Sequence, residues 1–177
     1  MINLLKLETG NIEQTNRDEI ELIRGVEYFK SELNETEKDV VRYLYAMASK
    51  YLLTHRPLDK LSEPHVALKM PAPEHTILRP ELAVVTNGQT FPDWIVEIAT
   101  SDNEENPYLL KTNLYAAAGV KEYWIVNPEK KVIMIYMFEK NGLMPVIHET
   151  PKRIKVGIYK DFYLSYSEIF KERIEAD

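Results

Sequence analysis

The sequence predicts a mixed α/β fold in which strand hairpins are joined by a crossover helix. Two short apolar runs, ELAVVT at 81–86 and WIVEIAT at 94–100, flank a connector with the turn signal Asn87-Gly88. A helix-forming segment at 107–118 follows them and precedes further strand-like segments. We therefore expect a mixed central sheet flanked by helices.

The chain is expected to begin with a strand pair and a long helix. Residues 18–30 (DEIELIRGVEYFK) predict two short strands with a break at Gly25. Apolar residues at helical spacing then predict an amphipathic helix over about 35–53. Asn34 with Glu37 three positions later is typical of a helix N-cap, so the helix is expected to start there.

The proline-rich segment 55–80 predicts loop, apart from one strand at 65–70. After the two apolar runs comes the helix at 107–118, which has clear end signals. Asn106 is its expected cap, and Gly119 is its expected C-terminal stop.

Strands predominate in the last third of the chain. Residues 122–126 and 131–138 predict two strands joined by the turn Asn127-Pro128-Glu129. Two short strands are expected around 145–158, and a closing helix is expected at 165–174.

The composition suits a single domain over residues 1–177 with an acidic N-terminal arm at about 1–33. Residues 1–40 contain 10 acidic and 5 basic side chains, and the remainder is nearly neutral. A general basic surface for nucleic acid is therefore not expected, and any nucleic acid would need a local patch. The chain has no cysteine, no apolar run of membrane-spanning length and no secretory signal at its start. These features predict a cytoplasmic protein without a membrane partner.

Two glutamates occupy apolar runs, where an unpaired carboxylate is costly. Glu97 lies within WIVEIAT, and Glu81 opens ELAVVT. If these runs form an antiparallel hairpin, opposed residue numbers sum to about 178, so Glu81 faces Glu97. Such a pair favours a cation between the carboxylates, and Mg²⁺ prefers oxygen ligands. Alternatively, Glu97 forms a structural ion pair with a lysine or arginine, or lies at an exposed strand end.

Lys111 lies at the edge of the buried arc of the helix at 107–118, about 100° from Leu110. Because this helix follows Glu97 after a short loop, its first turn is expected to return near the carboxylates. A lysine at that position can orient an attacking water or neutralise developing charge. The alternative is a lysine that packs its stem on the core and carries its ammonium to the surface.

The sequence lacks the motifs of several other catalytic chemistries. The four histidines lack zinc-site spacing, and the six glycines are too dispersed for a phosphate loop. The sequence has no GxSxG motif and no thiol nucleophile.

The stretch 79–138 resembles the Uma-two family of proposed restriction endonucleases. The similar segments are RPELAVV, FPDWIVEIATS and KTNLYAAAGVKEYWIVNPEKKVIMIY, of which YAAAGVKEYWIVNPE is the most specific. IELIRG and GIYKDFYLSYSEIF also resemble the start and end of the family pattern, so the resemblance covers nearly the whole chain. It implies the restriction-endonuclease-like fold of the PD-(D/E)XK nuclease superfamily.

The resemblance selects the same three side chains. Glu81 occupies the first acidic position, which is usually aspartate in the family, and Glu97 occupies the glutamate of the second motif. The lysine expected two residues later is absent, because position 99 is Ala99. In the family its role is thought to have moved to the following helix, where Lys111 matches. Pro107 replaces an acid that the family often has four positions before this lysine.

The family implies metal-dependent hydrolysis of phosphodiester bonds in DNA. Glu81, Glu97 and the backbone carbonyl of Ile98 would hold Mg²⁺, for which Mn²⁺ could substitute, and Lys111 would act on the attacking water. Glu37 is a further candidate ligand. Cutting both strands needs two sites, which favours a homodimer. The alternatives are a noncatalytic module that keeps the fold for binding or assembly, and a hydrolase of smaller phosphate esters.

Overall fold

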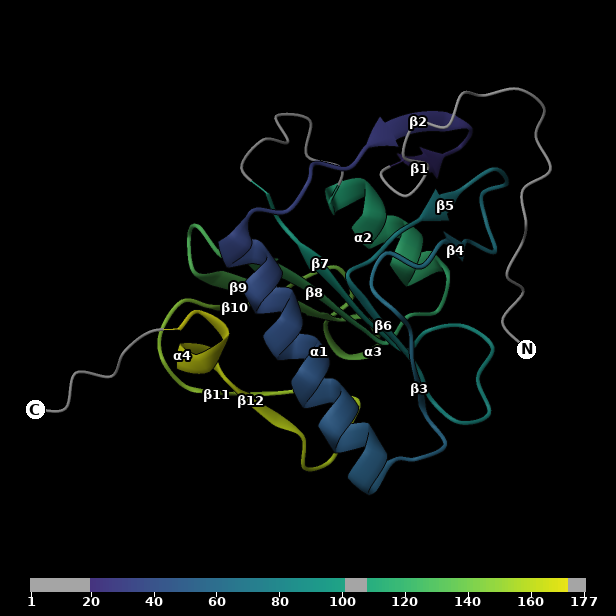
Figure 1. The fold of residues 1–177 in the computed structure, drawn as a ribbon. Coiled ribbons are helices and arrows are strands. Elements are labelled where there is room, and N and C mark those ends of the chain that lie inside the picture. The colour runs from purple at the N-terminus through teal and green to yellow at the C-terminus, as the bar shows by residue number, and fades with distance from the viewer. Residues whose placement is uncertain (1–19, 101–107, 172–177) are drawn as a thin grey trace, which may run out of the picture.

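The computed structural model describes residues 20–100 and 108–171 (Figure 1). Its main sheet has six strands, and β7 and β8 are its parallel pair, while the other neighbours are antiparallel. In spatial order these strands are β10 (Val146–His148), β9 (Val132–Met137), β8 (Glu122–Asn127), β7 (Trp94–Ile98), β6 (Leu82–Val85) and β3 (Lys60–Leu61). The connection between the parallel strands contains helix α2 (Tyr108–Ala117), as the sequence predicted.

Two smaller sheets accompany the main sheet. The four-stranded one has the order β2 (Val26–Phe29), β1 (Ile20–Ile23), β5 (Ile77–Leu78) and β4 (Leu68–Lys69). The other pairs β11 (Arg153–Lys155) with β12 (Tyr163–Ser165). The remaining helices are α1 (Glu35–His55), α3 (Phe138–Asn141) and α4 (Tyr166–Ile169). The predicted mixed sheet flanked by helices is confirmed.

The main sheet is covered on both faces, because successive apolar side chains along its strands point to opposite faces of the sheet. Figure 1 shows α1 crossing one face, where Val96 and Trp94 of β7 pack with α1, α4 and the β11–β12 pair. Ile95 and Ala99 point to the opposite face and pack with α2 and the four-stranded sheet. Glu97 shares the parity of Ile95, so its carboxylate enters this second layer.

The predicted register of β6 and β7 is confirmed. Leu82 faces Val96, and Val84 faces Trp94, so opposed residue numbers sum to 178. Just before the first residue of β6, the backbone N–H of Glu81 also donates to the carbonyl of Val96 at 3.1 Å.

Helix α1 begins as predicted. The Asn34 side chain accepts a hydrogen bond from the Glu37 backbone, and the Glu37 carboxylate accepts one from the Asn34 backbone. At the end of α2, Gly119 has a φ of 84°, which suits its predicted role as a helix stop. The expected cap at Asn106 and Pro107, the first residue of the predicted helix, lie outside the described residues.

Several elements differ from the predicted ones. Strands β3, β5 and β12 and the short helix α3 were missed, because elements of two to four residues carry too little periodicity to be recognised. The closing helix, predicted over 165–174, ends at Ile169, and Lys171 has a φ of 51° that is incompatible with a continuing helix. Residues 172–174 lie outside the described residues.

The described part of the predicted acidic arm is folded onto the rest. Within 20–33 it contains β1 and β2, and β1 pairs with β5 through Leu22 and Ile77. Within the ranges 20–100 and 108–171, no helix has the length and apolar character needed to cross a bilayer.

Candidate functional site

Glu97 is the centre of the site, and its side chain is fully buried. Its Oε1 accepts a hydrogen bond of 2.7 Å from the hydroxyl of Tyr115, while its Oε2 lies 3.0 Å from Nζ of Lys111. The same Oε2 lies 3.5 Å from Nζ of Lys30. Burial opposes ionisation of Glu97, but Lys111 and Lys30 outweigh it, and the pKa of this carboxyl is lowered. Glu97 is therefore a carboxylate at neutral pH that forms buried ion pairs, and the alternative of an exposed strand end is wrong.

Glu81 lies beside Glu97, as the predicted register required. Its Oε2 accepts a hydrogen bond of 2.7 Å from the backbone N–H of Ile98, and its Oε1 forms an ion pair with Lys30. Burial raises the pKa of Glu81, Lys30 opposes the rise, and the neighbouring Glu97 carboxylate adds to it. The two carboxylates thus share one cation.

Lys111 extends from the first turn of α2 into the same layer. Its ammonium lies 2.7 Å from Oε2 of Glu21 and 3.0 Å from Oε2 of Glu97. Only 2% of the residue is exposed, so the alternative of an ammonium at the surface is wrong. Burial disfavours its charge, but Glu97 and Glu21 outweigh burial and raise its pKa. Lys111 is therefore a buried cation.

Glu21 and Lys30 also belong to the site, although neither is among the residues predicted for it. Glu21, in β1, also accepts a hydrogen bond of 2.7 Å from the backbone N–H of Arg79. The sequence contains a signal for Glu21. Glu21 and Ile23 share the buried face of the strand IELI, so a carboxylate lies in an apolar strand, as Glu97 does in WIVEIAT. Lys30 follows β2 in a polar segment and gave no such signal.

Together these five residues form a buried ion-pair network, the carboxylate–lysine cluster: Glu21, Glu81, Glu97, Lys30 and Lys111. Its members come from β1, the segment after β2, the residue just before β6, β7 and α2. The cluster therefore connects the four-stranded sheet to the main sheet. The other proposed ligand, Glu37, is absent from the cluster, since its carboxylate is used to cap α1.

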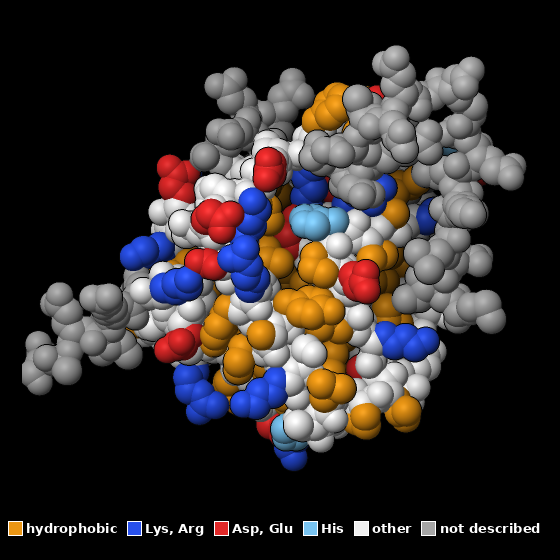
Figure 2. All heavy atoms as spheres, in the orientation of Figure 1, with side chains coloured by type: hydrophobic (Ala, Val, Ile, Leu, Met, Phe, Trp, Pro, Cys, Tyr) orange, Lys and Arg blue, Asp and Glu red, His pale blue; other side chains and the backbone are white. Residues whose placement is uncertain are grey.

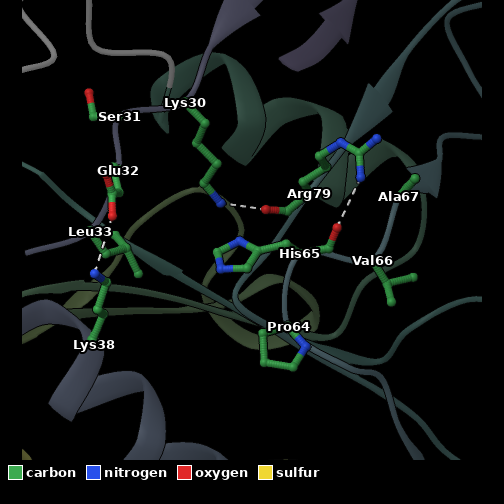
Figure 3. Close-up of a pocket in the computed structure, with 10 residues that line it drawn as sticks. All are labelled: Lys30, Ser31, Glu32, Leu33, Lys38, Pro64, His65, Val66, Ala67 and Arg79. Carbon is green, nitrogen blue, oxygen red and sulfur yellow. Dashed lines mark hydrogen bonds and ion pairs between the residues drawn. The ribbon is translucent and has the colours of Figure 1, made fainter. Parts of the chain in front are cut away.

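A cavity of about 580 Å³ lies next to the cluster and is lined by Lys30, Lys38, His65 and Arg79 among others (Figure 3). In Figure 3 the Lys30 side chain reaches toward the backbone carbonyl of Arg79, and the Arg79 guanidinium donates to the carbonyl of His65 at 3.1 Å. Among the coloured side chains of Figure 2, acidic and basic groups are interspersed on this face. This distribution agrees with the near-neutral charge expected outside the arm.

A family model described as "Putative restriction endonuclease", Uma2, matches residues 4–156. The chain belongs to the Uma2 family. Among solved structures, its fold is similar to the "crystal structure of a putative nuclease belonging to DUF820 from Anabaena variabilis ATCC 29413". The TM-score is 0.68 at 14% sequence identity, and the match covers 86% of this chain and 89% of that chain. The comparison with curated proteins found no match.

The Uma2 assignment raises the question of whether the cluster suits a divalent metal. Its donors do, because one oxygen each of Glu81 and Glu97 is directed at a single cationic group, the Lys30 ammonium. The third expected donor, the carbonyl of Ile98, accepts a hydrogen bond of 2.8 Å from the hydroxyl of Tyr108. In the described part of the chain, no three acidic or histidine side chains are grouped to hold a metal. The carboxylate pair therefore fits the ion in chemistry, but Lys30 occupies the position between the two oxygens.

Proposed function

We propose that this Uma2 protein is a metal-dependent endonuclease that hydrolyses phosphodiester bonds in DNA. The observation that supports the proposal is the convergence of two buried carboxylates, Glu81 and Glu97, on one cation at the family's motif positions. The family description supplies the nuclease class. Mg²⁺, or Mn²⁺ in its place, is the proposed ion, with the Ile98 carbonyl as a further ligand.

When bound, the metal supplies polarisation of a phosphate oxygen and a water of lowered pKa. The protein fixes the carboxylates for this task. The backbone N–H of Ile98 holds Oε2 of Glu81, and the Tyr115 hydroxyl holds Oε1 of Glu97. These bonds leave the other oxygen of each glutamate directed at the shared cation position.

Lys111 supplies a fixed positive charge beside this position. Glu21 and Glu97 both contact its ammonium, and these two ion pairs hold it beside the carboxylates. A cation held in a water-poor site stabilises the charge that develops on a phosphate in the transition state. We assign this role to Lys111, and the role of positioning Lys111 to Glu21.

The experiment is a cleavage assay with plasmid and linear DNA in Mg²⁺, Mn²⁺ or EDTA, with RNA and nucleotide esters in parallel. We expect cleavage of DNA that needs metal and is lost in Glu81→Gln and Glu97→Gln, while the exposed Glu149→Gln retains it. Calorimetric titration with Mn²⁺ accompanies the assay, because a missing target sequence prevents cleavage without preventing metal binding. Cleavage at the wild-type rate in both site variants would exclude the assigned carboxylates.

A noncatalytic module for binding or assembly is the second candidate, and one observation favours it. The two lysines already balance most of the charge of the three glutamates, so the cluster is close to neutral without metal. Absence of Mn²⁺ binding in the wild type and in every variant would favour this candidate.

We also propose that the protein acts as a homodimer, because cutting both DNA strands requires two sites related by symmetry. Sedimentation velocity with and without a DNA duplex measures this directly. A monomer in both conditions, together with double-strand cleavage, would contradict it.

A further inference from the structure

The ammonium of Lys30 has the surroundings of a bound metal ion. It contacts Oε1 of Glu81 and the backbone carbonyl of Arg79, and it lies 3.5 Å from Oε2 of Glu97. These oxygens come from three different positions in the chain. Carboxylate and carbonyl oxygens are the donors that hard divalent cations use in proteins.

Lys30 differs from Lys111 in its exposure and in the space beside it. Lys111 is on helix α2 and only 2% exposed, with two carboxylates in contact with its ammonium. Lys30 follows β2 in a loop, its side chain is 13% exposed, and it lines the cavity of about 580 Å³ (Figure 3). Rotation of its side-chain bonds can therefore carry the ammonium out of the cluster into an adjoining space without moving a strand.

We propose that Lys30 is an internal counter-ion that occupies the metal position of the cluster and moves into the adjoining cavity when a divalent cation binds. The inference rests on the proposed function, because it assigns Glu81 and Glu97 as the metal ligands. The ammonium and the metal exclude each other, since both need the same oxygen atoms and both are positive. Metal binding is thus an exchange of one cation for another.

This exchange weakens metal binding in the wild type, because part of the binding free energy is used to break the contacts of Lys30. Lys30→Met keeps the length of the side chain and removes the competing charge. We expect it to bind Mn²⁺ at least tenfold more tightly than the wild type in calorimetry. Lys38→Met is the matched control, because Lys38 lines the same cavity but pairs with Glu32 and Glu35.

A second measurement follows Lys30 itself in the wild-type protein. Amine acetylation at limiting reagent, read by mass spectrometry of peptides, reports how accessible each lysine is. We expect Lys30 to react slowly in EDTA and several-fold faster in saturating Mn²⁺, with Lys38 unchanged. Unchanged acetylation of Lys30 at saturating Mn²⁺ would overturn the proposal.

Thermal unfolding separates this role from a purely structural ion pair. Lys30→Met leaves the two carboxylates without their shared cation, so its melting temperature in EDTA should fall below that of the wild type. Mn²⁺ should restore it, with a larger upward shift than in the wild type. A variant that loses stability and gains no affinity would show a purely structural lysine. Lys30→Gln, which keeps hydrogen-bond donors, serves if Lys30→Met does not fold.

The outcomes distinguish this inference from the proposed function. If neither the wild type nor a folded Lys30 variant binds Mn²⁺, both are overturned. If the wild type binds Mn²⁺ with Lys30 acetylation and the affinity of Lys30→Met unchanged, the exchange alone is overturned. If the exchange occurs but no DNA is cut in any condition, the counter-ion role of Lys30 stands on the binding and acetylation data and is independent of the nuclease activity.

Discussion

The hydroxyl of Tyr115 donates a hydrogen bond of 2.7 Å to Oε1 of Glu97, and this bond joins α2 to β7 inside the core. It satisfies the oxygen of Glu97 that faces away from Lys111 and Lys30. The orientation of the carboxylate therefore depends on a neutral donor as well as on the two cations.

Removing this hydroxyl with Tyr115→Phe leaves a buried carboxylate oxygen without its partner. An unsatisfied buried group costs about 1–3 kcal/mol, so the free energy of unfolding should fall by about that amount in urea denaturation. Tyr123→Phe is the matched control. The ring centroids of Tyr123 and Tyr115 are 4.9 Å apart, and the buried hydroxyl of Tyr123 has no hydrogen-bond partner in the described structure. Equal losses in the two variants would contradict this reading of the bond.

Lys111→Met removes the cation shared by Glu21 and Glu97 and leaves both carboxylates buried. Breaking a buried ion pair from one side costs about 3–5 kcal/mol, and denaturant unfolding should show a loss of this size. Lys60→Met, an exposed change in β3, should alter stability by less than about 0.5 kcal/mol. A small effect at Lys111 would mean that the carboxylates take up protons instead of remaining charged.

Glu122 offers a test of pH dependence away from the cluster. It is fully buried, and its carboxylate accepts hydrogen bonds from the Trp124 indole at 2.6 Å and from the Ile158 backbone at 2.8 Å. Burial outweighs these bonds and raises its pKa above the usual value. The folded protein therefore binds this proton more tightly than the unfolded chain.

The sign of the pH effect follows from the raised pKa of Glu122. Its stabilising contribution is complete below the unfolded pKa, about 4.3, and is lost as the pH rises through the folded pKa. The unfolding free energy of the wild type minus that of Glu122→Gln should accordingly decrease as the pH rises from about 4 to 8. Denaturant unfolding at several pH values measures it. An increase over this range would show that the folded pKa is lowered.

The capping box of α1 gives a fourth prediction. Asn34→Ala removes the acceptor for the Glu37 backbone N–H, 3.0 Å away, and should cost about 1 kcal/mol of stability. Asn34→Asp keeps an acceptor at the N-cap and should retain most of it. Thermal unfolding compares the three proteins, and equal losses in both variants would assign the effect to the Asn34 amide rather than to the cap.

The sequence was sufficient to place Glu81 beside Glu97, because local patterns determine their positions. The turn between the two apolar runs sets the register, and the register places Glu81 beside Glu97. Lys111 lies at the edge of the buried arc of α2, so the helix pattern left an inward and a surface position open, and its contacts with Glu21 and Glu97 decide for the inward one. Glu21 carried the same signal as Glu97, a carboxylate in an apolar strand, but β1 was read as part of an acidic arm.

Lys30 could not be predicted, because its role depends on a contact across 67 residues of chain with Glu97. A lysine in a polar segment after a short strand is normally solvated, and no periodicity directs it inward. Only the packing of the four-stranded sheet against the main sheet brings Lys30 to its partners, Glu81 and Glu97.

The placement of Glu21 and Lys30 in the first hairpin has a consequence for how the protein opens. β1 and the segment after β2 each contribute a charge to the cluster. Detachment of this hairpin from the main sheet therefore breaks the ion pairs Lys30–Glu81 and Glu21–Lys111 and leaves Glu81 and Lys111 without these partners. The hairpin and the site should therefore open as one cooperative unit. Amide hydrogen exchange in β1 and β2 then becomes a remote gauge of which cation the site contains, readable without substrate.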